Sequence, residues 1–135
     1  MKTAFADTFY YLALLNRDDR RHEKAVHFST ALAVRTVTTA WVLTEVADAL
    51  AGLSQRSGFL TFLRHLQASA NVTIIPPSPA LFDRGLELYA RRPDKEWPLT
   101  DCISFLVMRQ HGITDALTED HHFEQAGFKA LLTLP

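Results

Sequence analysis

The chain contains only one cysteine, Cys102, among its 135 residues, so no disulfide can form within it. It also lacks any run of about 18 apolar residues, which argues against a membrane-spanning helix. Asp7 interrupts the first apolar residues, so the N-terminal segment does not have the long apolar core of a signal peptide. These absences exclude a disulfide-stabilised scaffold and favour a cytoplasmic protein that does not enter a membrane.

The chain also lacks a large excess of positive or negative charge. The 14 Lys and Arg residues nearly balance the 15 Asp and Glu residues, and the net charge is −1. Overall charge therefore does not attract a phosphate-rich partner. If metal ions neutralised four of the acids, the bases would outnumber the remaining acids. An RNA partner is compatible with this composition, provided that the attraction comes from metal and local basic patches.

Short apolar runs alternate with amphipathic segments along the chain, and no repeat or linker divides it. This alternation predicts an α/β fold in one domain, residues 1–135, with a central mostly parallel sheet of about five strands and helices on both faces. The predicted strands are 4–6, 35–38, 72–75, 115–118 and 129–132. The predicted helices are 8–15, 18–32, 40–53, 57–70, 79–91, 100–111 and 119–126, with Thr39, Ser78, Thr100 and Thr118 as candidate caps.

Four acids stand beside the apolar segments: Asp7, Glu45, Asp101 and Asp120. Asp7 and Asp120 follow the first and fourth predicted strands, and the carboxyl ends of parallel strands meet at one edge of a sheet. Glu45 lies at the margin of the apolar stripe of its helix. Asp101 begins a helix that has an inward-facing apolar row. Each acid alone also has a structural explanation, as a helix cap, a salt-bridged side chain or a dipole partner.

A group of acids beside a core needs a compensating positive charge, because like charges repel and burial disfavours the ionised form. A divalent cation would supply it, and carboxylate oxygens suit Mg²⁺ or Mn²⁺, with one or two ions per site. The neighbouring acids Asp115 and Glu119 are interpreted as solvated. The six histidines form no zinc-binding pattern, and His121 and His122 are interpreted as surface-loop residues.

Four short motifs together resemble PIN-domain ribonucleases, and most closely the VapC-type toxins of bacterial toxin–antitoxin pairs. The similarity covers nearly the whole chain, although Cys102 stands where many relatives have alanine. It implies Asp7, Glu45, Asp101 and Asp120 as the catalytic and metal-binding residues, with Thr8, Ser104 and Thr118 in support. The motifs are Ala6-Asp7-Thr8, Leu43-Thr44-Glu45-Val46, Leu99-Thr100-Asp101 and the segment 117–123.

The resemblance implies a metal-dependent endoribonuclease that hydrolyses RNA phosphodiester bonds, as the toxin of a type II toxin–antitoxin pair. Its expected partners are RNA, a cognate antitoxin and a second copy of the chain. Arg91, Arg92 and Lys95 are candidates for contacts to phosphates, and Trp97 for base stacking. Segment 17–21 carries a second basic group. The alternative for each basic group is an ordinary solvated face.

A catalytically inactive PIN-like interaction domain is the main alternative function. Segments 10–15 and 59–66 are apolar enough to be candidate antitoxin surfaces, although packing in the core explains much of this character. A phosphoryl-accepting receiver domain is disfavoured, because no lysine follows the last predicted strand. A haloacid-type phosphatase would need an acid where Phe9 stands, and no serine-hydrolase elbow motif is present.

Overall fold

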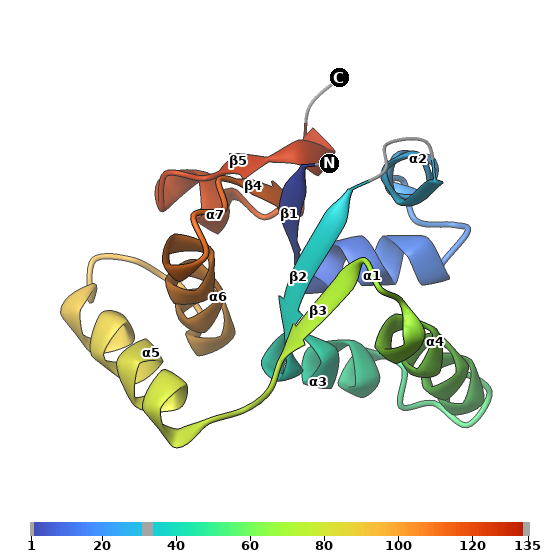
Figure 1. Ribbon diagram of the computed structural model, residues 1–135, viewed down its shortest axis with the longest axis horizontal. Coiled ribbons are helices and arrows are strands. Elements are labelled where there is room, and N and C mark those ends of the chain that lie inside the picture. Colours follow the sequence, from blue (N-terminus) through green and yellow to red (C-terminus); the bar gives the residue numbers. More distant parts are fainter. Residues whose placement is uncertain (1, 31–33, 134–135) are drawn as a thin grey trace.

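The computed structural model describes residues 2–30 and 34–133. Within them, five strands form one sheet in the order β3-β2-β1-β4-β5 (Figure 1). All of its strand pairings are parallel, so the sheet is fully rather than mostly parallel. The strands are β1 (Thr3–Ala6), β2 (Arg35–Thr39), β3 (Val72–Ile75), β4 (Asp115–Leu117) and β5 (Lys129–Ala130).

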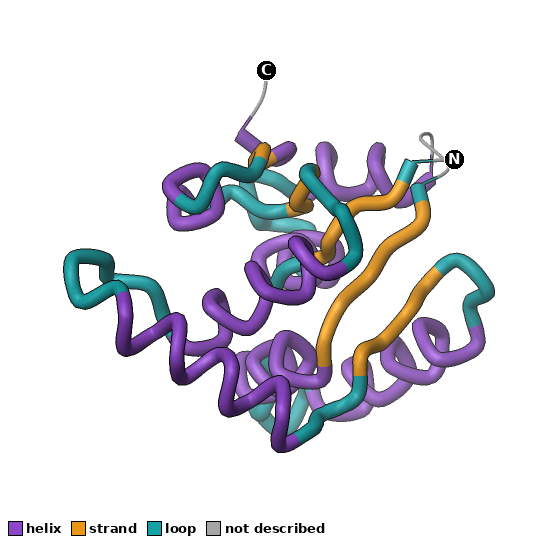
Figure 2. Tube along the Cα trace, turned by 60° about the vertical axis from the view of Figure 1, so that its left-hand side comes forward, coloured by secondary structure: helices purple, strands orange, loops and turns teal. Residues whose placement is uncertain are grey.

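Helices cover both faces of this sheet, as predicted. Figure 1 shows α1, α3 and α4 on one side of the strands and α5 and α6 on the other, and Figure 2 shows the same layers in a rotated view. The helices are α1 (Thr8–Leu15), α2 (His22–Thr30), α3 (Ala40–Ala49), α4 (Arg56–Ala68), α5 (Pro79–Arg91), α6 (Leu99–Gln110) and α7 (His121–Gln125), followed by the short 3-10 helix η1 (Leu131–Thr133).

The order in which the chain adds strands to the sheet reverses at β1. From β1 the chain passes outward to β2 and β3, and then returns through α5 and α6 to place β4 on the other side of β1. In parallel α/β sheets, ligands bind beyond the carboxyl ends of the strands at this switch point. The segments that follow β1 and β4 are therefore the favoured place for a functional site.

The core holds α6 in a fixed position against the sheet. Phe5 of β1, Phe105 of α6 and Phe123 of α7 are fully buried. Their rings form one cluster, with centroid separations of 6.3 Å between Phe5 and Phe123 and 5.0 Å between Phe105 and Phe123. Aromatic contacts of this kind add to the free energy gained by burial. The first turn of α6, which carries Asp101, is thereby anchored beside the end of β1.

Local sequence signals predicted several helix caps correctly, but the predicted caps of two helices were wrong. The Thr39 hydroxyl caps α3 by accepting the N–H of Val42 at 3.2 Å, and Ser78 caps α5 in the same way. Helix α6 begins at Leu99 after Pro98, so Thr100 is not its cap. Helix α7 is capped by Asp120, whose carboxylate accepts the N–H of His122 at 2.9 Å, and not by Thr118.

Other element boundaries also differ from the prediction, most of all in α2 and α3. Helix α2 begins at His22 and not at residue 18, because Asp19 forms a turn in which its carboxylate accepts the N–H of Arg21 at 2.8 Å; its predicted end at 32 lies outside the described residues. Helix α3 stops at Ala49, well before residue 53. Strand β5 ends at Ala130, where η1 takes over.

The apolar segments 10–15 and 59–66 are largely structural. Tyr10, Tyr11 and Ala13 are buried, and the ring of Tyr11 packs edge-on against Phe62 of α4 with centroids 5.3 Å apart. Of these segments, Leu15 and Leu60 keep exposed side chains. Separately, no helix in the described part of the chain is long and apolar enough to cross a membrane.

Candidate metal centre

The acids predicted from the sequence are brought together at the switch point of the sheet. Asp7 directly follows β1, and its N–H donates to the carbonyl of Leu117 at the end of β4, at 3.3 Å. Asp120 lies three residues beyond that strand. Helix α6 supplies Asp101, and α3 supplies Glu45. All four line one cavity of about 480 Å³, whose lining also includes the exposed Asp48 and Pro98.

Two of these carboxylates are almost completely buried. The exposed fraction is 2% for Asp7 and 5% for Asp101, whereas Glu45 and Asp120 are half-buried. Burial is the largest cause that raises the pKa of Asp7 to about 7, and the charges of Asp120 and Glu45 raise it further, against a hydrogen bond from Thr118. Burial first, and then the charges of Asp7 and Asp120, also hold the pKa of Asp101 far above its ordinary value.

Hydroxyl groups hold two of the acids in place. Thr118 donates to Oδ2 of Asp7 at 2.7 Å and accepts the N–H of Asp120 at 3.0 Å. Thr8 donates to Oε1 of Glu45 at 2.6 Å. Ser104 does not support Asp101 as expected, because its hydroxyl donates instead to the carbonyl of Thr100 at 2.9 Å within α6.

Basic side chains do not neutralise this group. Among residues 2–30 and 34–133, no Lys or Arg forms an ion pair with any of the four acids. Arg20 and Arg21 come close but bind the neighbouring Glu119 at 3.1 and 3.0 Å. Glu119 is therefore paired and half-buried, not solvated as expected, and Asp115 is likewise half-buried and pairs with Lys2 at 3.5 Å.

One histidine belongs to the site, which the sequence interpretation missed. Nδ1 of His122 lies 3.2 Å from Oδ2 of Asp101 and 3.1 Å from Oδ1 of Asp120, and its side chain is only 16% exposed. His121 matches the expected surface position, with its side chain 70% exposed. The missed signal was local: His122 follows Asp120 by two residues, so one short helix start carries both.

The base-stacking role expected for Trp97 is contradicted by its burial. Trp97 is 3% exposed, packs edge-on against Phe105 with centroids 5.1 Å apart and donates Nε1–H to Gln125 at 3.0 Å. Its ring has no free face for a base. Arg92 lies over it, 5.0 Å from the centroid, and pairs with Asp94 at 2.9 Å.

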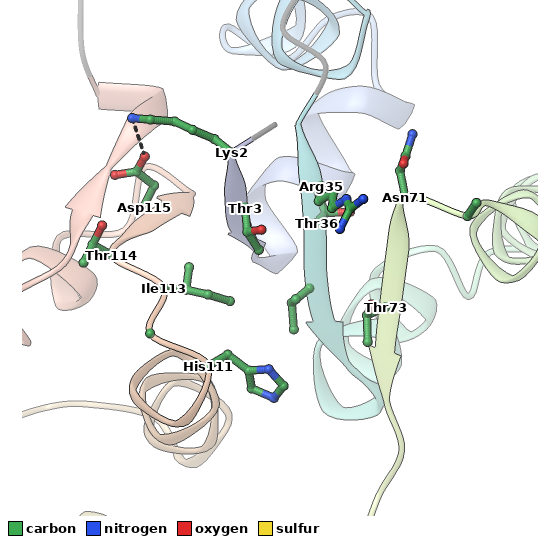
Figure 3. A pocket seen from close by; sticks show the side chains of 13 residues that line it. Lys2, Thr3, Arg35, Thr36, Asn71, Thr73, His111, Ile113, Thr114 and Asp115 are labelled. Atoms are coloured by element: carbon green, nitrogen blue, oxygen red, sulfur yellow. Dashed lines mark hydrogen bonds and ion pairs between the residues drawn. The ribbon is translucent and has the colours of Figure 1, made fainter.

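A larger cavity, of about 600 Å³, lies at the opposite edge of the sheet, where the strands begin (Figure 3). Thr3, Arg35 and Thr73 from the strands line it together with His111 from the end of α6. Its single acid, Asp115, pairs with Lys2 at 3.5 Å. Because it gathers no group of acids, this cavity is not the predicted metal centre.

The residues at the switch point fit a hard divalent cation. Such ions take oxygen ligands, commonly carboxylates, and here two buried carboxylates lie beside two half-buried ones. Like-charged groups at such a site are unfavourable without a compensating charge. Asp7, Asp101, Asp120 and Glu45 are thus the carboxylates that could hold a metal ion. Among the described residues, ligand atoms of Asp120, His121 and His122 also lie within 4.8 Å of one another.

A parallel α/β domain with buried carboxylates at its switch point defines a class of metal-binding domains whose acids come from separate strands and helices. The model of one such family, the PIN domain, matches residues 4–129. The chain belongs to the PIN-domain family, in agreement with the resemblance seen in the four motifs.

Among its relatives is the 23S rRNA-specific endonuclease VapC20 of Mycobacterium tuberculosis, 29% identical over 126 residues, which cover 92% of this chain and 94% of the relative. The crystal structure of VapC20, described as a toxin that cleaves the sarcin-ricin loop, aligns with a TM-score of 0.82 and 27% identity over 93% of this chain and 95% of that one. The structure of FitAcB from Neisseria gonorrhoeae aligns with a TM-score of 0.65 and 21% identity, over 97% and 99% of the two chains, and supports the fold.

Proposed function

We propose that this protein is a metal-dependent endoribonuclease and the toxin of a type II toxin–antitoxin pair. The observation that carries the proposal is the cavity lined by Asp7, Glu45, Asp101 and Asp120, with the exposed Asp48 at its edge, while no described Lys or Arg pairs with these acids. Its similarity to VapC20, an endonuclease specific for 23S rRNA, makes ribosomal RNA the substrate to test first. An interaction domain without activity would have no need to keep Asp7 and Asp101 buried together.

The surroundings of each acid indicate a different role in metal binding and catalysis. Asp7, Asp101 and Asp120 would hold Mg²⁺ or Mn²⁺, which when bound lowers the pKa of a water and stabilises negative charge on the phosphate. Glu45 is less buried and is fixed by Thr8, so that its second oxygen can orient the attacking water. Thr118 fixes the carboxylate of Asp7. Asp101 is buried, so bulk water has little access to its carboxylate.

The RNA strand has a natural route away from the acids. Pro98 lines both the acid cavity and an adjoining cavity of about 460 Å³. The second cavity is lined by Tyr89, Arg92 and Lys95, which offer an aromatic ring and two cations. We propose that phosphates pass Arg92 and Lys95, with Arg91 beside them, while a base stacks on Tyr89, whose side chain is half exposed. Tyr89 thus replaces Trp97 as the stacking candidate.

The test is cleavage of RNA by the purified protein. We expect cutting of 23S rRNA in the presence of Mg²⁺ or Mn²⁺, and none after EDTA. Asp7→Asn and Asp101→Asn should each lower the rate by at least about 100-fold, because each removes a charged ligand. Asp83→Asn, at an exposed position on α5, is the matched control and should cleave like the wild type.

Two results would contradict the proposal. One is cleavage that persists in EDTA or in both acid variants, which would point to a contaminating nuclease or another site. The other is a folded, metal-loaded protein that cuts no ribosomal or messenger RNA, which would favour the inactive interaction domain.

The partners of the proposed toxin are a cognate antitoxin and a second copy of the chain. Exposed apolar side chains support a protein partner: Leu53 lies just before α4, Leu60 lies on α4, and Phe82 and Leu86 lie on α5. Co-expression with the cognate antitoxin should yield a complex in which RNA cleavage is suppressed. Light scattering of the protein alone would report the proposed homodimer.

A further inference from the structure

His122 lies where two of the proposed metal ligands meet. It belongs to α7, whereas Asp101 belongs to α6, 21 residues earlier in the chain. The packing of Phe105 against Phe123 sets these two helices side by side. This packing in the core holds the imidazole among the acids. A histidine on an exposed loop would be free to swing away, but His122 is not.

The distances around this imidazole match those within a coordination sphere. Metal–nitrogen and metal–oxygen bonds of about 2.0–2.2 Å place neighbouring ligand atoms about 3.0–3.4 Å apart. Nδ1 of His122 lies 3.1 Å from Oδ1 of Asp120 and 3.2 Å from Oδ2 of Asp101. Ligand atoms of Asp120, His121 and His122 all lie within 4.8 Å of one another, but Nδ1 of His121 lies 3.7 Å from Asp120, outside this range, and its side chain is 70% exposed.

One hydrogen bond accounts for only one of these two contacts. A neutral imidazole nitrogen either donates one proton or offers one lone pair, and Nδ1 forms its hydrogen bond with Asp101. Oδ1 of Asp120 accepts the backbone N–H of His122 at 2.9 Å, so its approach to Nδ1 at 3.1 Å is a close contact without a hydrogen bond of its own. A cation bound by all three groups would use the lone pair of Nδ1 and would neutralise both acids. No described Lys or Arg pairs with either acid to compete for this role.

We propose that His122 is a nitrogen ligand of the ion held by Asp101 and Asp120, and that it makes the site prefer Mn²⁺ to Mg²⁺. The inference rests on the proposed function and concerns the identity of its metal. Mg²⁺ favours oxygen ligands and retains its waters, whereas imidazole is a better ligand for transition metals. Carboxylate ligands alone would discriminate little between these ions.

Pulsed electron paramagnetic resonance of the full chain loaded with one equivalent of Mn²⁺ tests the ligand directly. A bound imidazole gives a ¹⁴N hyperfine coupling, which we expect in the wild type and in His121→Asn, the matched control. It should be absent from His122→Asn and His122→Gln. By titration, the ratio of the Mg²⁺ and Mn²⁺ dissociation constants should fall about 10- to 100-fold in the His122 variants and stay unchanged in His121→Asn.

The wild-type spectrum decides the question even if the His122 variants fail to fold. A Mn²⁺ signal without ¹⁴N coupling would overturn the assignment of His122 while leaving the nuclease proposal intact. Loss of the coupling in His121→Asn alone would also overturn it, because the nitrogen would then belong to His121. Absence of any Mn²⁺ binding, or binding unaffected by Asp101→Asn, would instead contradict the proposed metal centre itself.

Discussion

The hydroxyl of Thr118 donates a 2.7 Å hydrogen bond to Oδ2 of Asp7, across 111 residues of sequence. Both residues are buried, and each follows directly on one of two neighbouring strands, β1 and β4. The same hydroxyl accepts the N–H of Asp120. Through one side chain, the ends of the two strands fix the positions of two of the proposed metal ligands.

Replacing Thr118 by valine should therefore impair the centre without changing its volume. Thr118→Val removes the bond to Asp7, and we expect metal affinity and RNA cleavage to fall about 10- to 100-fold, as for other residues that orient metal ligands. Thr118→Ser keeps the hydroxyl and should retain most of the activity. Equal losses in the two variants would show that packing of the methyl group, and not the hydrogen bond, is what matters.

Stability of the metal-free protein should depend on pH through Asp7 and Asp101, because burial raises the pKa of both carboxyls. The pKa of Asp7 is raised to about 7 in the folded protein from an ordinary 3.8. Between these values the folded state binds a proton that the unfolded state has lost, so stability falls as pH rises. The part of the decrease that comes from Asp7 is roughly 3–4 kcal/mol from about pH 4 to pH 7, and this part is complete once the pH exceeds the folded pKa of Asp7. Thermal unfolding in EDTA across this range measures it.

Asp7→Asn should make this profile shallower, because asparagine does not ionise and can still accept the hydrogen bond from Thr118; the slope that remains comes from Asp101, whose pKa burial also raises. Above pH 7 the metal-free variant should be more stable than the metal-free wild type. The exposed Asp18→Asn should keep the wild-type profile. A profile for Asp7→Asn that is as steep as the wild type would assign the pH dependence to another group.

Tyr89 and Trp97 should separate RNA binding from folding. Trp97→Ala removes a buried indole and should destabilise the protein by about 3–5 kcal/mol. Tyr89→Ala removes a half-exposed ring and should change stability by less than about 0.5 kcal/mol. Because Tyr89 stacks on a base in the proposed RNA route, Tyr89→Ala should weaken single-stranded RNA binding by about 1–3 kcal/mol. Filter binding with a catalytically impaired Asp101→Asn background gives the affinity; an unchanged value would remove Tyr89 from the route.

Much of the fold was predictable because its signals are local. Val72–Ile75 is a β-branched run stopped by two prolines, and Ser78 with Pro79 marks the next helix start. The order of strands and helices gave the parallel sheet and its switch point, and hence the edge where the acids meet. The cap of α6 was misplaced because Leu99 and Pro98 carry no capping side chain, so nothing local reveals that start.

The finer features of the site depend on contacts between distant segments, which no local pattern encodes. Trp97 lies in a polar stretch and is buried only because Phe105 and Gln125 surround it. Glu119 is paired because the turn before α2 brings Arg20 and Arg21 to it. His122 joins the acids because α6 and α7 pack together. Sequence could place each residue on an element but could not show which elements touch there.

The close packing of α5 on α6 depends on the absence of a side chain at Gly85. A Cβ built there would overlap Cγ1 of Ile103, whereas one built at Gly58 in α4 meets no atom within 4 Å. Both glycines are in helices, where alanine is intrinsically better by about 0.5–1 kcal/mol. The two positions therefore form a matched pair that differs in available space.

Gly85→Ala should destabilise the protein by about 1–3 kcal/mol, because overpacking outweighs the gain in helix propensity, while Gly58→Ala should stabilise it by about 0.5–1 kcal/mol. Urea midpoints at constant slope measure both changes. If overlap with Ile103 is the cause, Ile103→Ala in the Gly85→Ala background should cost less than it does alone, since the new methyl group fills part of the space that the isoleucine leaves. Strictly additive effects in this double-mutant cycle would mean that the two helices move apart instead of clashing.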